Sequence, residues 1–395
     1  MDLDELLSQG VGRGASDVHF KPGSYPILRI HGALELQEDW PKVTQESMLD
    51  QAKRLLRPAR LTALLEEGKE QDLAHTVKGV GRFRVNLFLA KGEVHGSFRV
   101  IPNRIPAFEE LNLPKALEKL AMERRGMIMV TGVTGSGKTT TQAAMIDYMN
   151  RYRNDHIITI EDPIEFLHED KTCVISQREI GQDSSDFTQA LRAALRQDPD
   201  VILVGEMRDP ETMAVALHAA ETGHLVLSTL HTLNAAETIN RLIASFPPHQ
   251  EDQIRSQLAG VMAGIISQRL VVKAGGKGRV PAVEVMVGTG LIRESIRDPE
   301  KTPQIPAIIA AGQSQYGMQT FDQSLLALYR DDKISLETAL EAASNPDDFA
   351  LKVRGIFSAA EMTWEVGADD PGEPGARAIP GAPAAGGANF FKKEK

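Results

Sequence analysis

The chain of 395 residues contains a single cysteine, Cys173. One cysteine can build neither an intramolecular disulfide nor a cysteine-rich zinc site, so the sequence excludes a disulfide-stapled scaffold and fits a reducing compartment. The sequence also lacks an uninterrupted run of about 18 apolar residues, and its acidic start, MDLDELLSQG, has neither the positive flank nor the apolar core of a signal peptide. We therefore expect neither a membrane span nor a secretory leader.

Positive charge and aromatic residues are scarce as well. The chain has 54 acidic residues against 44 Lys plus Arg, a formal net charge of −10, and only 5% aromatic residues. Nucleic-acid binding needs clustered positive charge, and binding of single strands adds aromatic stacking platforms. The composition therefore argues against direct binding of nucleic acid. The hydrophobic share of 42% is enough for well-filled cores, and the length suggests about two or three domains.

The stretch GVTGSGKTTTQ, residues 132–142, matches the phosphate-binding loop pattern G-x-x-x-x-G-K-[ST]. The apolar run GMIMV before it predicts a buried strand, and TTTQAAMIDYMN after it has helical periodicity. Such a loop turns backbone N–H groups and the positive end of the helix toward a polyphosphate. We expect Lys138 on the β and γ phosphates and the Thr139 hydroxyl on Mg²⁺. The nucleotide-binding candidates are Gly132, Thr134, Gly135, Ser136, Gly137, Lys138, Thr139 and Thr140.

Composition and periodicity divide the chain into four parts. Residues 1–101 hold strand-like pieces around a helical stretch, which predicts a small α+β domain, and the proline-punctuated residues 102–114 predict a linker. Residues 115–362 open with apolar strands separated by helices, the pattern of a parallel sheet. From PPHQEDQIRSQLAGVMAGIISQRLV onward we expect a largely helical segment. Residues 363–395 are dominated by Gly, Ala and Pro, which predicts disorder.

Polar residues close the predicted strands of the parallel sheet. HIITIEDP ends in Glu161 and Asp162, VILVGEMRD contains Glu206, and HLVLSTLHT leads to His231. Ligands of open parallel sheets bind outside the carboxyl ends of the strands. Beside a phosphate loop, these residues predict a hydrolytic site in which a carboxylate orients the attacking water.

The role of each residue at the strand ends is open at this stage. Glu206 is the first candidate for the water-orienting base and a candidate for holding the metal, while Glu161 and Asp162 are second candidates for the base or for support of the metal. His224 and His231 are seven residues apart, so within one strand they would point to opposite faces, and at least one of them lies off the strand. His231 is the candidate sensor of the γ-phosphate or of a neighbouring subunit.

Arginines that stabilise the developing charge must come from elsewhere in the chain. Arg84 in RFRVN and Arg99 in SFRV lie in strand-like pieces of the first domain, where the alternative is a solvated strand position. Arg192 and Arg196 share a helix face at i, i+4 spacing, which favours ion pairing or a subunit contact over catalysis.

Together, GVTGSGKTTT, TIEDPIEF, VILVGEMRDPET and AAETGHLVLSTLHT resemble the secretion ATPases and, among them, the type IV pilus retraction ATPases, the family of PilT and its paralogue PilU. The resemblance implies an α/β protein with a PAS-like α+β N-terminal domain, a RecA-like P-loop ATPase domain with a helical C-terminal part, and a homohexameric ring. By motif matching it implies Walker A at 132–139, an Asp box at Glu161 and Asp162, Walker B at Glu206, a His box at His224 and His231, and arginines that reach the nucleotide at Arg84 and Arg99.

The resemblance also implies a function. It is Mg²⁺-dependent ATP hydrolysis that drives pilus retraction through a PilC-like platform protein of the inner membrane, with a paralogous retraction ATPase as a further partner. The implied location is the cytoplasmic base of the pilus machine, peripheral to the inner membrane. Assembly and type II secretion ATPases remain alternatives, although they usually carry a longer amino-terminal region and a four-cysteine zinc element. A RecA-like nucleic-acid motor is the alternative of a different class.

The segment LIRESIRD, residues 291–298, resembles the retraction motif AIRNLIRE. It keeps Ile292, Arg293, Ile296 and Arg297, which on a helix would place the arginines on one face and the isoleucines on an adjacent one. We expect this helix to offer a docking surface. The departures from the motif leave open whether the chain is the main retraction motor or the accessory paralogue.

Overall fold

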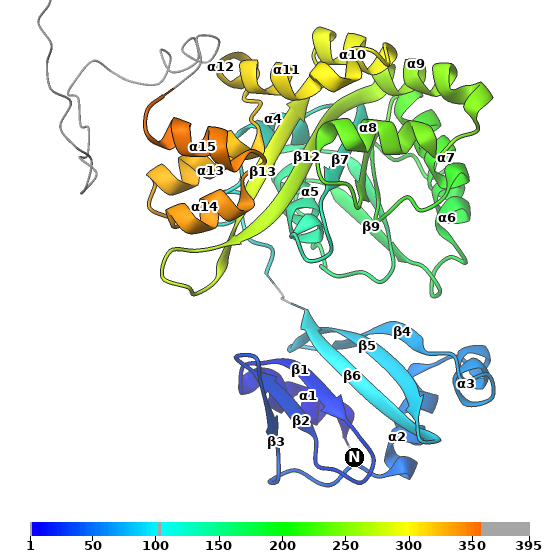
Figure 1. Ribbon diagram of the computed structural model, residues 1–395. Helices are drawn as coiled ribbons and strands as arrows, with labels where there is room; N and C mark the ends of the chain where they lie inside the picture. The colour runs from blue at the N-terminus through cyan, green and yellow to red at the C-terminus, as the bar shows by residue number, and fades with distance from the viewer. Residues whose placement is uncertain (1, 102–103, 357–395) are drawn as a thin grey trace, which may run out of the picture. The chain divides into compact units, whose positions relative to one another are not determined.

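The computed structural model describes residues 2–101 and 104–356, whose strands form two separate sheets (Figure 1). The expected α/β fold class is confirmed. Of the expected parts, the linker at 102–114 lies partly outside the described residues and the tail at 363–395 wholly outside them. Within residues 2–101 and 104–356, none of the helices combines the length and the apolar composition that crossing a bilayer requires.

The first sheet is antiparallel and has the strand order β3-β2-β1-β6-β5-β4. Its strands are β1 (Ala15–Phe20), β2 (Ile27–Ile30), β3 (Ala33–Leu36), β4 (Gln71–Val77), β5 (Gly81–Ala90) and β6 (Glu93–Ile101). Helices α1 (Leu3–Gly12), α2 (Gln45–Leu55) and α3 (Pro58–Leu65) pack on it. The chain leaves the helical conformation at Leu56 and Arg57, because Pro58 disfavours helix for the residue before it.

The second sheet has the order β13-β12-β7-β11-β10-β8-β9, in which only the β12–β13 pair is antiparallel. Its strands are β7 (Gly126–Thr131), β8 (His156–Glu161), β9 (Val174–Glu179), β10 (Val201–Val204), β11 (Leu225–Leu230), β12 (Met262–Val272) and β13 (Arg279–Val287). The helices up to β12 are α4 (Ala116–Ala121), α5 (Lys138–Tyr152), α6 (Phe187–Ala194), α7 (Pro210–Glu221), α8 (Ala235–Ala244) and α9 (Glu251–Val261).

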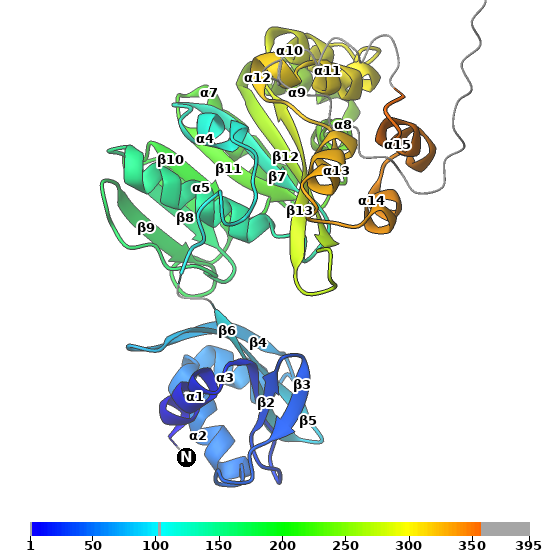
Figure 2. The ribbon, with the colours of Figure 1, turned by 90° about the vertical axis from the view of Figure 1, so that its left-hand side faces the viewer.

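Helices cover both faces of this sheet (Figure 2). Side chains alternate along each strand, so Met127 and Met129 of β7 enter the core shared with α6 to α9, while Ile128 and Val130 enter the core shared with α4 and α5. All four side chains have no exposed surface. Burial on both faces explains why the sequence of β7 is a continuous apolar run rather than an alternating one.

The expectation of a largely helical segment after residue 245 is wrong for MAGIISQRLV. These residues form β12, which pairs with β7 on one side and with β13 on the other. Ile265 and Ile266 of β12 are fully buried in the two cores on opposite faces of the sheet, so tertiary pairing decides the conformation of a run that periodicity leaves ambiguous. The helices that follow are α10 (Gly290–Arg297), α11 (Ile305–Ala311), α12 (Gln313–Tyr316), α13 (Phe321–Arg330), α14 (Leu336–Ala342) and α15 (Pro346–Val353).

The segment that resembles the retraction motif forms α10. Ile292 and Ile296 have no exposed surface and belong to the core. Arg293 donates hydrogen bonds to the carbonyl oxygens of Gly288 at 2.9 Å and Gly260 at 2.5 Å. The prediction of a docking surface is therefore wrong for the two isoleucines, which stabilise the fold instead. Leu291 keeps 55% of its surface exposed.

Candidate nucleotide-binding site

The phosphate loop joins the end of β7 to the start of α5. Gly132 has φ +141°, and a Cβ atom there would lie 2.4 Å from the backbone oxygen of Gln268. Gly137 adopts a left-handed conformation with φ 93° immediately before α5. Only glycine fits the first position and glycine is strongly preferred at the second, so the spacing of the motif is the spacing that this turn requires.

The Lys138 ammonium folds back over the loop. It donates hydrogen bonds to the carbonyl oxygens of Gly132 at 2.8 Å and Val133 at 3.1 Å. Burial lowers the pKa of Lys138, while the negative charges of Glu206 and Glu165 act in the opposite direction. The Lys138 ammonium therefore lies at the N-terminus of α5, where the helix dipole already favours anions.

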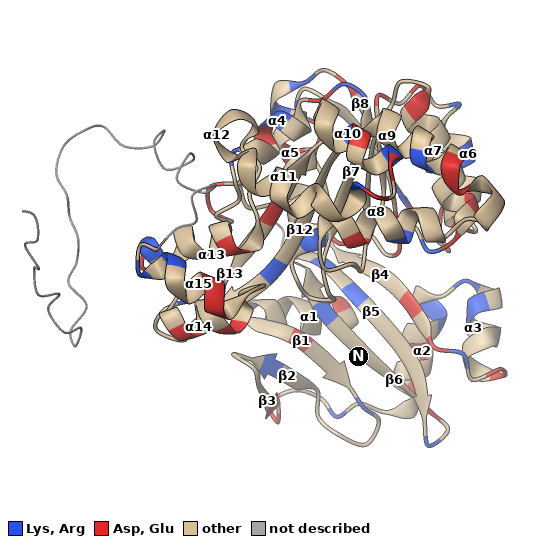
Figure 3. Cartoon of the chain, turned by 45° about the horizontal axis from the view of Figure 1, so that its top comes forward, with Lys and Arg blue, Asp and Glu red and all other residues tan. Residues whose placement is uncertain are grey.

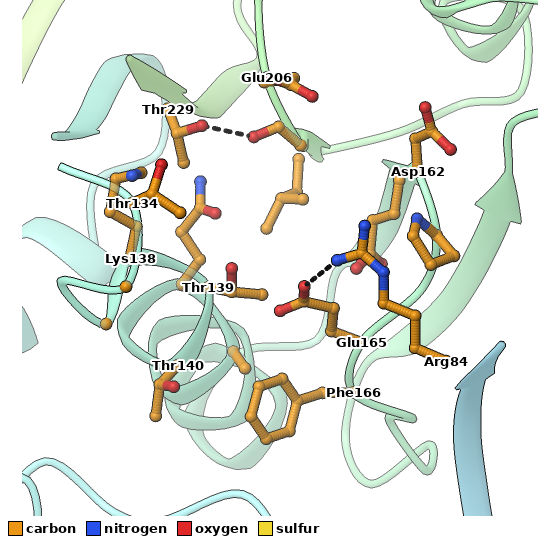
Figure 4. A pocket seen from close by; sticks show the side chains of 18 of the residues that line it. Arg84, Thr134, Lys138, Thr139, Thr140, Asp162, Glu165, Phe166, Glu206 and Thr229 are labelled. Atoms are coloured by element: carbon orange, nitrogen blue, oxygen red, sulfur yellow. Dashed lines mark hydrogen bonds and ion pairs between the residues drawn. The ribbon is translucent and has the colours of Figure 1, made fainter. Parts of the chain in front are cut away.

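A cleft of about 640 Å³ opens beside the loop, within the usual size range of small-molecule sites. Thr134, Gly135, Gly137, Lys138, Thr139 and Thr140 line it, whereas Gly132 and Ser136 are not among its lining residues. Five further lining residues follow the carboxyl ends of the parallel strands or end them, namely Glu161, Asp162, Glu206, Thr229 and His231. Figure 4 shows Asp162 and Glu206 across from Lys138 and Thr139. The structure thus brings the strand-end candidates together with the phosphate loop.

Two glutamates of the cleft have different surroundings. Glu161 is half-buried, and its Oε1 accepts hydrogen bonds from Thr159 Oγ1 at 2.6 Å and Gln177 Nε2 at 3.2 Å. Burial raises the pKa of Glu161, and the hydrogen bonds of Thr159 and Gln177 act against this rise. Glu206 instead forms an ion pair with Arg208, which raises the pKa of the guanidinium.

The two histidines lie at opposite ends of β11. His231 follows the carboxyl end, where its Nε2 lies 4.0 Å from Glu206 Oε2 and its side chain is 57% exposed. His224 precedes the amino end, where its Nδ1 lies 2.9 Å from the carbonyl oxygen of Ala219 and 3.3 Å from Thr222 Oγ1. The structure places His231 in the cleft and gives His224 contacts with the end of α7 instead.

Both candidate arginines of the first sheet are among the residues that line the cleft. Arg84 of β5 has its Nη1 3.6 Å from Glu165 Oε1, an ion pair that Figure 4 marks. Arg99 of β6 donates from Nε to Asp17 Oδ1 at 2.8 Å, and its side chain remains 70% exposed. Each guanidinium thus has a carboxylate partner within reach of the site.

For Arg192 and Arg196 the spacing predicted ion pairing or a subunit contact rather than catalysis. Arg192 Nη2 lies 2.7 Å from Glu211 Oε1, and Arg196 Nη1 donates to the carbonyl oxygen of Arg192 at 3.0 Å. The prediction of ion pairing is confirmed for Arg192.

The cleft also has lining residues that the sequence did not single out, among them Glu165, Phe166, Arg208 and Arg279. Arg208 could have been found, because it lies two residues after Glu206 in VGEMRD and the short loop keeps both side chains together. Arg279 begins β13, a strand that the sequence reasoning took for helix, so no signal pointed to it.

The residues of the cleft fit a magnesium ion bound together with a nucleotide. In residues 2–101 and 104–356, no group of three or more His, Cys, Asp or Glu could hold a metal ion by itself. A Mg²⁺ ion that bridges phosphates needs less from the protein, since substrate oxygens and water supply most of its ligands. Thr139 and Glu206 line the cleft and offer the hard oxygen donors that this ion prefers.

Comparisons with known proteins agree with this geometry. The model of the family described as "Type II/IV secretion system protein" matches residues 102–313. The "Type IV pilus retractation ATPase PilT" of Pseudomonas aeruginosa is 44% identical over 88% of this chain and 100% of its own length. The "Type IV pilus ATPase PilU" of the same species is 38% identical over 94% of this chain and 98% of its own length.

Among solved structures, "Crystal Structure of the Pilus Retraction Motor PilT and Bound ADP" matches with a TM-score of 0.80 and 44% identity. The match covers 88% of this chain and 98% of that chain. Similarity of this extent in both sequence and fold shows common descent of the matched part of the chain.

Proposed function

Since the chain belongs to the type II/IV secretion proteins and, within them, to the type IV pilus retraction ATPases, we propose that it hydrolyses ATP to power pilus retraction. The observation that carries the proposal is the cleft in which a phosphate loop faces Glu161, Glu206 and His231. A nucleotide-binding module without turnover would need the loop but not these strand-end groups.

The phosphate loop holds the substrate by charge and by backbone donors. The N–H groups at the start of α5 and the Lys138 ammonium hold the β and γ phosphates, while Thr139 and Glu206 hold Mg²⁺. Bound there, Mg²⁺ neutralises charge on the phosphate oxygens. Lys138 exchanges its hydrogen bonds to the loop carbonyls for phosphate oxygens, which compensates the burial of its charge.

The two glutamates divide the work at the reacting centre. A proton acceptor for water benefits from a pKa above the ordinary carboxyl value, and burial raises the pKa of Glu161. Glu206 lines the cleft, where its carboxylate offers the hard oxygen donors that Mg²⁺ prefers. We therefore assign the acceptance of the proton from water to Glu161 and the binding of Mg²⁺ to Glu206. Asp162 is retained as an exposed supporting carboxylate. The alternative is Glu206 as the base, which the sequence favours.

Arginine and histidine complete the charge stabilisation. Arg84 and Arg99 are the cations for the transition state, each leaving a carboxylate partner when it turns toward the phosphates. His231 senses the γ-phosphate and passes this signal to the neighbouring Glu206. His224 has a structural role, since its ring is bound at the end of α7.

The working form that we propose is a homohexamer attached to the inner membrane through a PilC-like platform protein, with a paralogous retraction ATPase as an additional partner. A PAS-like domain at 1–101, a linker at 102–114, an ATPase domain at 115–362 and a tail at 363–395 are the proposed parts. The similarity to PilT and PilU supports a role in pilus retraction over a role in pilus assembly or type II secretion.

A nucleic-acid motor is the alternative of a different class. In Figure 3 acidic and basic residues are interspersed over the helices of the ATPase domain, whereas a nucleic-acid motor would need a basic stripe. ATPase activity that DNA or RNA stimulates would favour this alternative.

The test is complementation of a strain that lacks its own copy of the gene, with wild type, Lys138→Ala or Lys53→Ala. Lys53 is an exposed lysine of α2 whose ammonium lies 3.6 Å from Asp50, so its removal is a matched control. Surface pili and retraction events are counted in the cells, and ATP hydrolysis is measured with the purified full chain. We expect Lys138→Ala to lower hydrolysis by roughly a hundredfold or more.

Excess surface pili without retraction, rescued by wild type and Lys53→Ala but not by Lys138→Ala, support the proposal. Loss of pili would place the protein on the assembly side. Hydrolysis in vitro without any pilus phenotype would leave an ATPase but overturn the assignment to retraction.

A further inference from the structure

A chain of buried polar side chains crosses the second sheet behind the cleft. Thr131, the last residue of β7, donates a hydrogen bond from its hydroxyl to Ser267 Oγ of β12 at 3.0 Å. Ser267 lies opposite Thr131 of β7 on one side and opposite Glu284 of β13 on the other in the strand register, so the three side chains are cross-strand neighbours on one face of the sheet. Thr131 and Ser267 have no exposed surface and Glu284 keeps 6%. Thr131, Ser267 and Glu284 are called the sheet relay below. Its first residue, Thr131, directly precedes the phosphate loop.

The sheet relay ends at the segment that carries His231. Glu284 Oε1 accepts a hydrogen bond from the backbone N–H of Ala235 at 2.8 Å. Ala235 is the first residue of α8 and follows the loop 231–234. The Glu284 carboxylate thus binds the start of α8 and lies across the strand pair from Ser267, which connects the phosphate loop to the His231 loop through the sheet.

Both ends of the sheet relay are hydrogen-bonded. Thr131 donates to Ser267, and the N–H of Ala235 donates to the Glu284 carboxylate. Burial raises the pKa of Glu284, while the N–H of Ala235, the charge of Arg269 and the Ser267 hydroxyl act against this rise.

Capping of α8 does not account for a buried carboxylate at this position. Asn234 already caps the helix, since its Oδ1 accepts the N–H of Glu237 at 2.8 Å. Burying ionisable and polar groups in a sheet is costly, and well-packed apolar residues in their place are often neutral or stabilising. The buried groups of the sheet relay thus connect two loops and do not add to the stability of the fold.

The same strand also braces the phosphate loop directly. Gln268, next to Ser267, donates from Nε2 to Thr141 Oγ1 of α5 at 2.9 Å, and its backbone oxygen abuts Gly132. A shift of the phosphate loop therefore acts on β12 at two adjacent residues, Ser267 and Gln268. Only Ser267 of this pair passes the shift to β13, because its side chain lies between Thr131 and Glu284.

We propose that Glu284 is a positioning residue that couples the His231 loop to the phosphate loop through Ser267 and Thr131. Nucleotide at the phosphate loop fixes Thr131, the hydroxyl relay fixes the carboxylate, and the carboxylate fixes the start of α8. His231 is held in register with the bound phosphates as a result. This inference rests on the proposed function only in that a nucleotide binds the phosphate loop.

The test is hydrogen exchange of the full-length chain with and without ADP, followed in segments 132–140 and 231–236. Wild type is compared with Thr131→Val, which removes the hydroxyl at nearly constant shape, and with Thr131→Ser, which keeps it. Ser267→Ala breaks the next link, and Ser295→Ala, another buried serine whose hydroxyl bonds only within α10, is its matched control.

In wild type, Thr131→Ser and Ser295→Ala, we expect ADP to slow exchange in both segments. In Thr131→Val and Ser267→Ala, protection of 132–140 remains, while protection of 231–236 falls by about threefold or more. Either of the two variants suffices if the other does not fold. Equal protection of 231–236 in all variants, or no effect of ADP on 231–236 in wild type, would overturn the coupling.

Kinetics give a second readout that a merely structural role would not move. We expect Ser267→Ala to lower kcat for ATP about fivefold with KM unchanged, the size of one buried hydrogen bond. Combined with His231→Ala it should cost nothing further, because both changes remove the same function. Full additivity would overturn the inference while hydrolysis itself stands. Absence of ADP protection at 132–140 and of hydrolysis in wild type would instead remove the proposed function.

Discussion

The carboxyl ends of β8 and β10 are neighbours in one sheet, and each is followed by a glutamate. Ile160 of β8 pairs with Val204 of β10, so Glu161 comes one residue after the paired position and Glu206 comes two residues after it. Gly205 fills the extra position, with its N–H bonded to the Ile160 oxygen at 2.8 Å. That one residue moves Glu206 from the sheet into the open cleft, while Glu161 stays against the strands.

The difference teaches that two identical side chains at adjacent strand ends acquire different chemistry from their surroundings. Glu161 is surrounded by neutral donors from Thr159 and Gln177, and burial raises its pKa. Glu206 lies beside the cations of Arg208 and, when it is protonated, His231. Pairs of carboxylates whose surroundings differ in this way commonly divide proton transfer from charge stabilisation.

Removal of the Glu161 carboxylate is expected to have the largest effect. Glu161→Gln keeps the size of the side chain but cannot accept a proton from water, so kcat should fall by about a hundredfold or more while ATP still binds. Steady-state hydrolysis and nucleotide titration check this. Glu169→Gln, an exposed change in the same segment, should behave as wild type. If the Glu161→Gln enzyme keeps nearly full activity, Glu206 and not Glu161 is the base.

Glu206→Gln should act on the metal rather than on the proton. An amide is a poorer ligand for a hard cation, so we expect the Mg²⁺ concentration for half-maximal hydrolysis to rise by about tenfold or more, with partial recovery of kcat at saturating Mg²⁺. Titration of hydrolysis with Mg²⁺ at fixed ATP measures this shift. An unchanged Mg²⁺ requirement together with a large loss of kcat would break the proposed division of roles.

The phosphate loop and the strand ends could be predicted because their information is local. Gly132, Gly137 and Lys138 are fixed by the shape of one turn, and parallel strands bring Glu161 and Glu206 to one edge whatever the connections. The partners of each glutamate could not be predicted, since they depend on the register of strands that are distant in sequence.

Strand β12 shows the other limit of the sequence. Its apolar run is long enough for a buried helix, and the pairing with β7 that makes it a strand joins residues more than a hundred positions apart. The partnership of Ser267 with Thr131 was therefore invisible. The motif at α10 failed differently, because spacing places Ile292 and Ile296 on one face without telling whether that face meets solvent or core.

Thr159→Val tests the hydrogen bond that holds the Glu161 carboxylate. Thr159 is fully buried, and its hydroxyl favours the ionised form, so its loss should raise the pKa of Glu161 further. A base works only when deprotonated, hence activity is lost as pH falls through this pKa. We expect the acid limb of the kcat profile to move to higher pH by up to about one unit. Thr159→Ser should leave the limb in place, and an unmoved limb in Thr159→Val would remove Glu161 from the titration.

Arg208→Ala should have the smallest effect, with the opposite sign to Glu206→Gln. The guanidinium is 69% exposed, and such ion pairs contribute about 0.2–1 kcal/mol, so its competition for the Glu206 carboxylate is weak. Without Arg208 the Mg²⁺ concentration for half-maximal hydrolysis should fall by about two- to threefold at low salt, and the gain should shrink as salt screens the pair. Arg208→Lys, which keeps the charge, should lie between the two. A rise in the Mg²⁺ requirement would mean that Arg208 supports the bound phosphates rather than competing for Glu206, and the two strand ends would then differ in partners but not in function.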